Sequence, residues 1–494
     1  MNSKIADTTN KTKKLKMSSK KVIAVDLDGT LTLTDTLHES ILVLVRNKPL
    51  FLFILPFWLI KGLAFLKLKV AQNIELDVKN LPYNLPLIDW LKKEKANGKK
   101  IVLCTAANER IAKDVSNHLQ LFDDVISSDE SINLIGVNKR IALQDRFGDK
   151  GYDYAGNSRA DIEVWASSSK AIVVNASNSI QNEASKITTV SRTFPSASIK
   201  FSDWIRALRV YQWSKNLLLF IPLLTSHQLG NFQSLPVLTI AFISFSLCAS
   251  SVYIINDLLD LESDRQHPRK KYRPFSEAKL SIVMGLVIIP FLIIASFTLG
   301  FMLGKEFFIV LMLYFILTGA YSLILKRIVL VDCLTLAILY TIRIIAGAAV
   351  VSVSLSFWLL AFSVFIFLSL AFVKRYTELM IQAKAGNDQT HGRDYEVSDS
   401  VLLQILGISA GYLSVLIMAL YMQSEDVMNL YAQPVAIWFA IPLLLFWISW
   451  VWLKATRGLM NDDPIVFAIR DKASIFVAVL TALVFLYAAK GQVI

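Results

Sequence analysis

A group of acidic residues follows a long apolar segment in the second half of the chain. In NDLLDLESDR (256–265), Asp257, Asp260 and Asp264 are spaced by three and four residues, so on a helix they share one face. Carboxylates crowded near lipid repel one another, and a bridging divalent cation removes that conflict. Mg2+ takes oxygen ligands and commonly shares its shell with the phosphates of a substrate. The spacing therefore predicts a metal site, and the alternative is a solvated acidic helix end.

Basic residues follow these carboxylates at once, in HPRKKYR (267–273). Cationic side chains form short, strong hydrogen bonds to phosphate oxygens. We therefore expect Arg265, Lys271 and Arg273 to bind phosphate groups of a substrate beside the metal. Carboxylates for a metal and cations for phosphate together predict a diphosphate site.

A second pair of aspartates, Asp26 and Asp28, lies near the start of the chain, where the pattern is that of an α/β domain. Strand-like β-branched runs alternate there with helical stretches: strands at 21–27, 100–106 and 170–176, and helices at 86–97 and 109–119. Such alternation predicts a parallel sheet covered on both faces. Ligands bind at the carboxyl ends of parallel strands, which is where Asp26, Asp28 and Thr105 fall.

The composition argues against a purely soluble protein. Of the 494 residues, 54% are hydrophobic and only 18% are charged, and the mean hydropathy is +0.50. An ordinary soluble protein has about 25% charged residues. The three cysteines, Cys104, Cys248 and Cys333, are too scattered for a disulfide framework or a zinc site.

The apolar residues of the second half predict a helical membrane domain. We expect nine spans, the first of them the weakest, centred near residues 220, 245, 291, 315, 340, 365, 412, 444 and 483. The loops after the even-numbered spans contain sixteen Lys and Arg residues, and the loops between them contain one. This bias predicts an integral protein of the cell (inner) membrane, whose N-terminal domain and active sites face the cytoplasm.

These patterns divide the chain into three parts. Residues 1–20 form a basic tail that we expect to be disordered. Residues 21–195 form the α/β domain, with a cap insert at about 37–90, and residues 202–494 form the all-α membrane domain. Because basic residues gather in one set of membrane loops, the net charge of +12 indicates a membrane lipid partner and no nucleic acid.

The insert contains an apolar run, LVRNKPLFLFILPFWLIKGLAFLKLKVA (44–71), interrupted by Pro49, Pro56 and several basic residues. Each apolar piece is too short to span a bilayer. We interpret the run as an interfacial hairpin with Trp58 and the lysines at headgroup depth. The alternative is a buried cap helix.

The motif at 256–265 resembles that of the UbiA superfamily of intramembrane prenyltransferases. That superfamily has nine helices and an N-D-x-x-D-x-x-x-D motif, here Asn256 to Asp264. YSLILKR (321–327) is similar to the same family. The resemblance implies Mg2+ on Asp257 and Asp260 supported by Asp264, with Asn256, Tyr321 and Lys326 near the substrate.

Where most members carry a second aspartate-rich motif, this chain reads KRYTEL, with Lys374, Arg375 and Glu378. Together with RVYQWSKN, which contains Lys215, and the DP…RD pattern of Asp463, Pro464, Arg470 and Asp471, this resembles a branch that transfers 5-phosphoribose from phosphoribosyl diphosphate to polyprenyl phosphate. A polyprenyl phosphate acceptor adds an anion, which Lys374, Arg375 and Arg393 would neutralise. The alternative for Lys374 and Arg375 is simple anchoring on the cytoplasmic side.

VDLDGTLTLTDT (25–36) resembles the first motif of the haloacid dehalogenase superfamily, which implies a Rossmann-like domain with a helical cap. The family's chemistry makes Asp26 the nucleophile, Asp28 the acid for the leaving alcohol, and Thr105 the phosphate-binding hydroxyl. Lys139 matches the lysine that screens phosphate, with Lys150 as the alternative. The resemblance also implies Mg2+ on Asp26 and Asp28. In GNSRAD (156–161), Asn157 replaces a metal-binding aspartate, and Asp161 is implied as a further metal ligand.

The two resemblances predict a bifunctional, Mg2+-dependent membrane enzyme. The membrane half would make polyprenyl-phosphoryl-5-phosphoribose, and the soluble half would remove the 5-phosphate. The alternative is a prenyltransferase with an aromatic or other acceptor, joined to a regulatory or degenerate phosphatase module.

Overall fold

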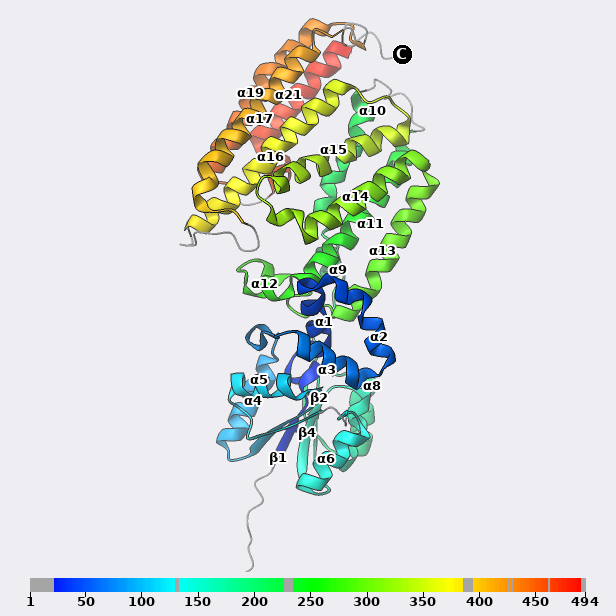
Figure 1. Ribbon diagram of the computed structural model, residues 1–494, viewed down its shortest axis with the longest axis vertical. Helices are drawn as coiled ribbons and strands as arrows, with labels where there is room; N and C mark the ends of the chain where they lie inside the picture. The colour runs from blue at the N-terminus through cyan, green and yellow to red at the C-terminus, as the bar shows by residue number, and fades with distance from the viewer. Residues whose placement is uncertain are drawn as a thin grey trace, which may run out of the picture. The chain divides into compact units, whose positions relative to one another are not determined.

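A computed structural model describes residues 22–128, 133–225, 234–384, 394–424, 427, 430–460 and 463–489. The basic tail predicted at residues 1–20 lies outside these ranges. The chain divides into two compact units. Figure 1 labels the helices and strands and colours the chain by residue number. The first unit combines Met1–Trp204 with Asp257–Gly285, and the second combines Ile205–Asn256 with Leu286–Ile494.

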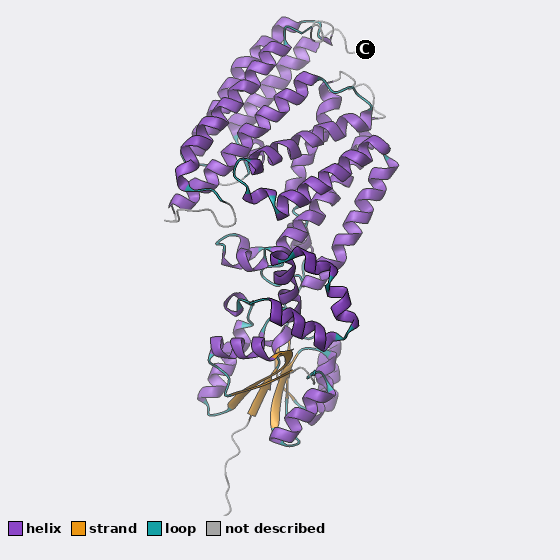
Figure 2. Ribbon diagram, viewed as in Figure 1, coloured by secondary structure: helices purple, strands orange, loops and turns teal. Residues whose placement is uncertain are grey.

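The first unit is built on a six-stranded parallel sheet in the order β3-β2-β1-β4-β5-β6 (Figure 2). Its strands are β1 (Val22–Val25), β2 (Lys100–Asn108), β3 (Asp124–Ser128), β4 (Tyr152–Gly156), β5 (Ala171–Val174) and β6 (Val190–Phe194). The predicted strands at 21–27, 100–106 and 170–176 are β1, β2 and β5. The predicted α/β class is therefore confirmed.

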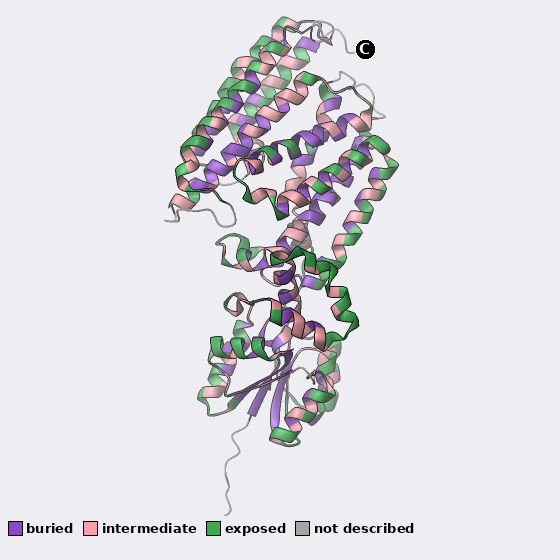
Figure 3. Ribbon diagram, in the orientation of Figure 1, coloured by how far each residue is buried: buried purple, intermediate pink, exposed green. Residues whose placement is uncertain are grey.

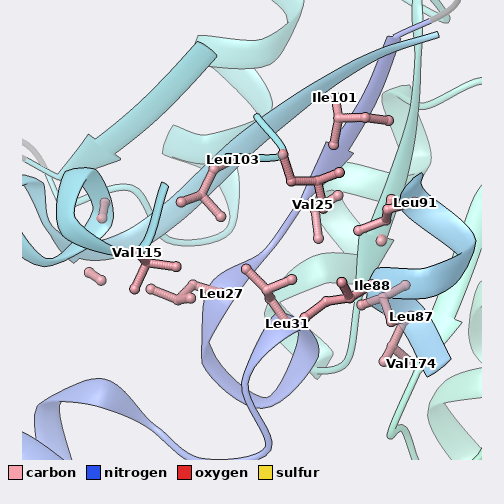
Figure 4. Packing of buried hydrophobic residues seen from close by; sticks show 14 of the residues in the cluster. Val25, Leu27, Leu31, Leu87, Ile88, Leu91, Ile101, Leu103, Val115 and Val174 are labelled. Carbon is pink, nitrogen blue, oxygen red and sulfur yellow. The ribbon is translucent and has the colours of Figure 1, made fainter. Parts of the chain in front are cut away.

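Helices cover both faces of this sheet. Successive side chains of a strand point to opposite faces, so β1 contributes residues to both layers. Ile23 and Val25 belong to the same buried cluster as residues of α4 (Leu85–Ala96) and α5 (Glu109–Leu119), the two helices predicted from sequence. Figure 4 shows Val25 in this cluster with Leu91 of α4 and Val115 of α5. Val22 and Ala24 face the other layer, which contains α6 (Val137–Phe147), α7 (Ile162–Ser167) and α8 (Asn178–Ile187). All four residues of β1 are buried.

The insert between β1 and α4 forms a helical cap. Its elements are the turn η1 (Leu27–Leu31), α1 (Thr36–Asn47), η2 (Pro49–Phe53), α2 (Leu55–Ile60), α3 (Leu63–Asn73) and η3 (Val78–Asn80). α3 buries Leu66 and Val70 against α1, but η2 and α2 bury no residue. Seven large apolar side chains of residues 49–60 are exposed, namely Leu50, Leu52, Phe53, Ile54, Phe57, Leu59 and Ile60. A fully buried cap therefore does not describe η2 and α2.

Residues 257–285 also belong to the first unit. They include the end of α11 (Ser234–Leu259), α12 (Leu261–Gln266), η6 (Lys270–Tyr272) and the start of α13 (Ile282–Met302). The predicted metal-binding aspartates thus lie in a segment that packs with the α/β domain.

The second unit is a helical bundle that carries the membrane character of the chain. It contains α9 (Phe201–Ala207, shared with the first unit), η5 (Val210–Phe220), α10 (Ile221–Thr225), α14 (Lys305–Leu323), η7 (Leu325–Arg327), α15 (Val331–Val351), α16 (Phe357–Lys384), η8 (Val397–Asp399), α17 (Ser400–Tyr421), η9 (Pro434–Phe439), α19 (Ala440–Thr456), α20 (Pro464–Arg470) and α21 (Lys472–Ala489), besides most of α11 and α13. Within the described ranges, eight helices are long and apolar enough to cross a membrane. Many of their apolar side chains are exposed, and Figure 3 colours the exposed residues of these helices green.

These eight helices correspond to the second through ninth predicted spans. The first, centred near 220, consists of η5 and α10, which together cover residues 210–225 and fall short of the ~20 residues that a full span needs. The predicted all-α membrane bundle is confirmed, with an irregular first segment.

Candidate active sites

The first site lies at the carboxyl end of β1, where the chain turns through η1. Asp26 follows the last residue of β1, and its Oδ1 accepts hydrogen bonds from the Leu27 N–H at 2.9 Å and from Lys139 Nζ at 2.8 Å. Among the described residues, both hydrogen bonds to the Asp26 carboxylate go to Oδ1, so Oδ2 is the oxygen available to a substrate. Burial raises the pKa of Asp26 to about 6, although the Lys139 ammonium acts against this.

Lys139 is buried on α6 and connects Asp26 to Asp161. Its Nζ lies 3.0 Å from Tyr154 Oη and 3.8 Å from Asp161 Oδ1. Burial alone would lower the pKa of Lys139, but Asp26 and Asp161 raise it above its ordinary value. Lys150, the alternative from sequence, instead donates to the Ala166 carbonyl at 2.7 Å. The geometry therefore places Lys139, rather than Lys150, beside the predicted nucleophile.

The Asp161 carboxylate accepts four hydrogen bonds from described residues. Oδ1 accepts from Tyr154 Oη at 2.7 Å, and Oδ2 accepts from the Asn157 N–H, the Ser158 N–H and Ser158 Oγ at 3.0, 2.9 and 2.9 Å. These bonds fix the loop that carries Asn157. In this arrangement Asp161 acts on the site through Lys139 and the loop.

Asp28 lies in the η1 turn, two residues beyond Asp26. Its Oδ1 accepts from the Thr36 N–H at 2.7 Å, which ties the turn to the start of α1. Burial raises the pKa of Asp28 to about 7, and the Asp35 carboxylate adds to the rise. A carboxyl with this pKa retains part of its proton near neutrality, as an acid for a leaving alcohol requires.

Gly29 allows Asn157 to approach this turn. Its φ of +73° is the left-handed region, and a Cβ there would lie 2.0 Å from Asn157 Nδ2. Asn175 fixes the same turn by donating from Nδ2 to the Gly29 carbonyl at 3.0 Å. The Asn157 amide thus lies beside the turn that carries Asp26 and Asp28. The carboxylates of Asp26, which is buried, and Asp28, which is half-buried, and the amide oxygen of Asn157 are hard oxygen ligands of the kind that Mg2+ takes.

Thr105 and Lys67 complete this end of the sheet. Thr105 is fully buried in β2, and its Oγ1 accepts from the Ala107 N–H at 2.9 Å. Lys67 reaches in from α3 of the cap and donates from Nζ to the Ala106 carbonyl at 2.7 Å. Burial lowers the pKa of Lys67, against the opposing effect of Asp28, Asp35 and Asp26. Sequence reasoning missed Lys67 because nothing in its local pattern distinguishes it from the other lysines of the insert.

The second group of carboxylates spans the end of α11 and α12. Arg273 Nη1 lies 3.1 Å from Asp257 Oδ1 and also contacts Asp264 Oδ2 at short range. Two predicted metal ligands therefore converge on one cationic position. Asp260 begins α12 as its N-cap residue. Burial raises the pKa of Asp264, while Arg273 and Lys270 lower it.

Across the described ranges, no three acidic, histidine or cysteine side chains lie close enough together to hold a metal ion. The side chains of Asp257, Asp260 and Asp264 therefore do not form a three-carboxylate metal site in this structure. Mg2+ in substrate-binding sites is commonly held by one or two carboxylates together with substrate phosphates. Asp257 with Asp264, and Asp26 with Asp28, fit that smaller ligand set.

Arg265 lies next to these carboxylates but binds the α/β domain. Its Nη2 is 2.6 Å from Glu39 Oε1 and its Nη1 is 3.2 Å from Glu39 Oε2, in a paired and largely buried arrangement. Nε also donates to the Ser276 carbonyl at 3.2 Å. Arg265 was expected to bind substrate phosphate, and this geometry does not favour that role.

In the second unit, Lys215 and Lys374 share one carboxylate. Their Nζ atoms lie 2.6 and 3.3 Å from Asp463 Oδ2, with Tyr340 Oη 3.5 Å away. Burial would raise the pKa of Asp463, but the two ammonium groups hold it well below its ordinary value. The group keeps a surplus positive charge, and Lys374 is its more exposed member, with 28% of its side chain exposed against 9% for Lys215. Sequence analysis named all three residues, Asp463 as part of the DP…RD pattern, but did not predict their contact. Arg393, which was also expected to neutralise the acceptor, lies outside the described residues.

Arg375 is the centre of a separate buried cluster. Its guanidinium contacts Asp332 and Glu378 at short range and donates to Tyr321 Oη at 2.9 Å. Tyr395, which sequence analysis did not single out, also donates to Asp332. The cluster brings together three predicted substrate residues, Tyr321, Arg375 and Glu378. Since two carboxylates already neutralise Arg375, the geometry favours Lys374 over Arg375 as a phosphate ligand.

The remaining predicted residues lie in simpler surroundings. Asn256 donates from Nδ2 to Ser322 Oγ at 2.9 Å, next to Tyr321 in sequence. Lys326 lies in η7, at the end of α14. Lys271 lies in η6 with its Nζ 5.1 Å from the centroid of the Tyr272 ring.

Comparison with known proteins identifies the family to which the chain belongs. The model of the UbiA prenyltransferase family matches residues 219–464. The decaprenyl-phosphate phosphoribosyltransferase of Mycolicibacterium smegmatis is 30% identical over 280 residues, which cover 55% of this chain and 87% of that protein. The chain belongs to the UbiA prenyltransferase family. This UbiA-family protein is also 35% identical over 466 residues to the uncharacterised protein y4nM of Sinorhizobium fredii, a match that covers 94% of this chain and 90% of the relative.

Solved structures resemble each half of this UbiA-family protein at low identity. A UbiA homologue from Archaeoglobus fulgidus bound to GPP and Mg2+ is 15% identical with a TM-score of 0.45, covering 58% of this chain and 99% of the other. A phosphoserine phosphatase in its apo form is 16% identical with a TM-score of 0.27, covering 35% of this chain and 93% of the other.

Proposed function

We propose that the membrane half transfers 5-phosphoribose from phosphoribosyl diphosphate to a polyprenyl phosphate. The observation that supports this most directly is the pair of lysines on Asp463. Two ammonium groups on one carboxylate leave a positive charge for an anionic acceptor, and Lys374 is exposed enough to offer it. A neutral aromatic acceptor would not use that charge. The relative from Mycolicibacterium smegmatis carries this activity in its name.

The donor diphosphate would be bound by the segment 257–285. Asp257 and Asp264 would hold Mg2+, which when bound neutralises negative charge on a diphosphate. Arg273 already lies between these carboxylates, so it is placed to contact the same phosphates. The acceptor phosphate is an ionised nucleophile, so its attack on C1 of the ribose needs no general base. The C1–O bond to the diphosphate breaks as the new bond forms.

We further propose that the α/β domain is a phosphatase that removes the 5-phosphate from the lipid product. Asp26 Oδ2 attacks phosphorus while Lys139 fixes Oδ1 and offsets its charge. Asp28 gives its proton to the departing 5-oxygen, and water then hydrolyses the aspartyl phosphate. Asp26 and Asn157 would hold Mg2+, which screens the two approaching anions when it is bound, while Asp28 keeps its proton for the leaving oxygen.

We also propose that the even-numbered loops and the phosphatase face the cytoplasm, since sixteen of seventeen loop cations lie on that side. The exposed apolar side chains of η2 and α2 lie beside lysines, with Lys48 5.4 Å from the Phe51 ring centroid. An apolar face flanked by cations suits the surface of an anionic bilayer.

Mass analysis of the lipid product tests the transferase proposal. Purified protein is incubated with phosphoribosyl diphosphate, a polyprenyl phosphate and Mg2+, and Asp257→Asn serves as the inactive control. We expect a lipid heavier by ribose or phosphoribose in the wild type only. If an aromatic acceptor is consumed and polyprenyl phosphate is not, the proposal is wrong.

A further inference from the structure

A pocket between the cap and the α/β domain lies beside Asp28. It is lined by residues of α1, α3, β2 and α5, among them Asp28, Thr36, Ser40, Lys67 and Asn108. Asp28 is the group proposed to protonate the leaving oxygen. The part of the substrate that departs must therefore lie next to Asp28, where this pocket is.

Two polar groups of the pocket have hydrogen-bonding capacity to spare. Ser40 is 1% exposed, and its Oγ has no hydrogen-bond partner within the described part of the chain. A buried hydroxyl without a hydrogen bond costs free energy, so a ligand that pairs with Ser40 Oγ would gain that free energy on binding. The Lys67 ammonium has three N–H donors, and the described residues accept from one of them, through the Ala106 carbonyl at 2.7 Å.

Charge shows what kind of ligand would suit these donors. Asp28, Asp35 and Asp26 all interact electrostatically with the Lys67 ammonium. In the described ranges, however, no oxygen of these three carboxylates lies within 4.0 Å of Lys67 Nζ, the limit for an ion pair. A cationic donor and a hydroxyl donor in one pocket match the oxygens of an anion. The same pair offers little to a purely apolar leaving group.

We propose that this pocket is a subsite for a second anionic group of the phosphatase substrate, bound by Lys67 and Ser40. The inference rests on the proposed phosphatase and names its substrate class: a sugar phosphate that carries another phosphoester at the far end of the sugar. The lipid product of the membrane half has that form, with a 5-phosphate to be removed and a phosphodiester at C1. Lys67 then distinguishes this product from simple phosphate monoesters.

Kinetics on the full-length protein with Mg2+ test the subsite. The probes are ribose 1,5-bisphosphate, with two phosphates, and ribose 5-phosphate, with one, and phosphate release is measured. We expect Lys67→Met to raise KM for the bisphosphate about tenfold to a hundredfold more than it raises KM for ribose 5-phosphate. Ser40→Ala should raise the same KM severalfold. Lys69→Met is the matched control, because Lys69 lies on the same helix and contacts Gln72.

Two results would overturn the subsite. One is a KM for the bisphosphate that Lys67→Met leaves unchanged, and the other is an equal loss of kcat on both probes, which would make Lys67 a support of the reacting centre. If the wild type releases no phosphate beyond the Asp26→Asn background, the proposed phosphatase fails instead. Calorimetric measurement of binding to the Asp26→Asn protein then decides the subsite. In that protein, Lys67→Met must weaken the binding of the bisphosphate and not that of ribose 5-phosphate. Equal affinities for the bisphosphate with and without Lys67 refute the subsite.

Discussion

The ion pair between Glu39 and Arg265 makes a sharp prediction about the segment that carries the acidic motif. Glu39 lies on α1 of the cap, and Arg265 lies on α12, next to Asp264. The guanidinium holds Glu39 through two contacts, at 2.6 and 3.2 Å, and also the Ser276 carbonyl. We expect Glu39→Gln to loosen residues 257–285, and to raise KM for phosphoribosyl diphosphate more than it lowers kcat.

The magnitude follows from burial. The two side chains are 5% and 10% exposed, and removing one partner of a buried ion pair costs about 3–5 kcal/mol because the other charge remains unpaired. Glutamine keeps one hydrogen bond to Arg265, so we expect about 2 kcal/mol for Glu39→Gln, which corresponds to about thirtyfold faster local opening. The double variant Glu39→Met with Arg265→Met removes both charges and should lose less than the two single variants combined.

Hydrogen exchange of the full-length protein, read over peptides from 257–285, measures this opening. Glu75→Gln is the matched control, because Glu75 pairs with Arg110 on the surface, with 90% of its side chain exposed. We expect faster exchange in Glu39→Gln and unchanged exchange in the control. Exchange in Glu39→Gln within twofold of wild type, or strictly additive effects in the double variant, would refute the reasoning.

Three further predictions follow from other parts of the molecule. Gly29→Ala should abolish phosphate release and spare phosphoribosyl transfer, because a Cβ at φ +73° meets Asn157 at 2.0 Å; phosphatase activity equal to wild type would contradict the geometry of the turn. Lys374→Met should raise KM for polyprenyl phosphate about tenfold, whereas Lys384→Met on the same helix should not, and equal effects would remove the acceptor site from Lys374. A dye whose emission depends on its surroundings can be attached to Leu52→Cys, because the three native cysteines are buried. In anionic nanodiscs the dye should emit as it does in an apolar medium, and free quenching by an aqueous quencher would exclude the interfacial cap.

Much of the fold is legible in the sequence, for identifiable reasons. Strands covered on both faces appear as continuous apolar runs, so β1, β2 and β5 could be predicted. β6 (Val190–Phe194) escapes because most of its residues are exposed. The helices of the membrane bundle are long apolar runs, whereas η5 and α10 are short and irregular, and the predicted first span is accordingly weak.

The sites divide in the same way. Asp26, Asp28 and Thr105 follow from strand ends, and Lys139 from the order of motifs. Contacts between distant segments could not be predicted, because nothing local requires them: Lys67 meets Ala106 across 39 residues, and Glu39 meets Arg265 across 226. The charge of a residue also misleads when its partners are unknown. Arg375 suggests a phosphate ligand in the sequence, but in the structure two carboxylates neutralise it.

Double labelling of the donor tests the central claim most directly. Phosphoribosyl diphosphate carrying 14C in the ribose and 32P in the 5-phosphate is incubated with polyprenyl phosphate, Mg2+ and either wild-type protein or Asp26→Asn. We predict a wild-type lipid that contains 14C without 32P, and an Asp26→Asn lipid that contains both. A lipid fraction without 14C would contradict the transferase, and 32P retained equally by both proteins would contradict the phosphatase.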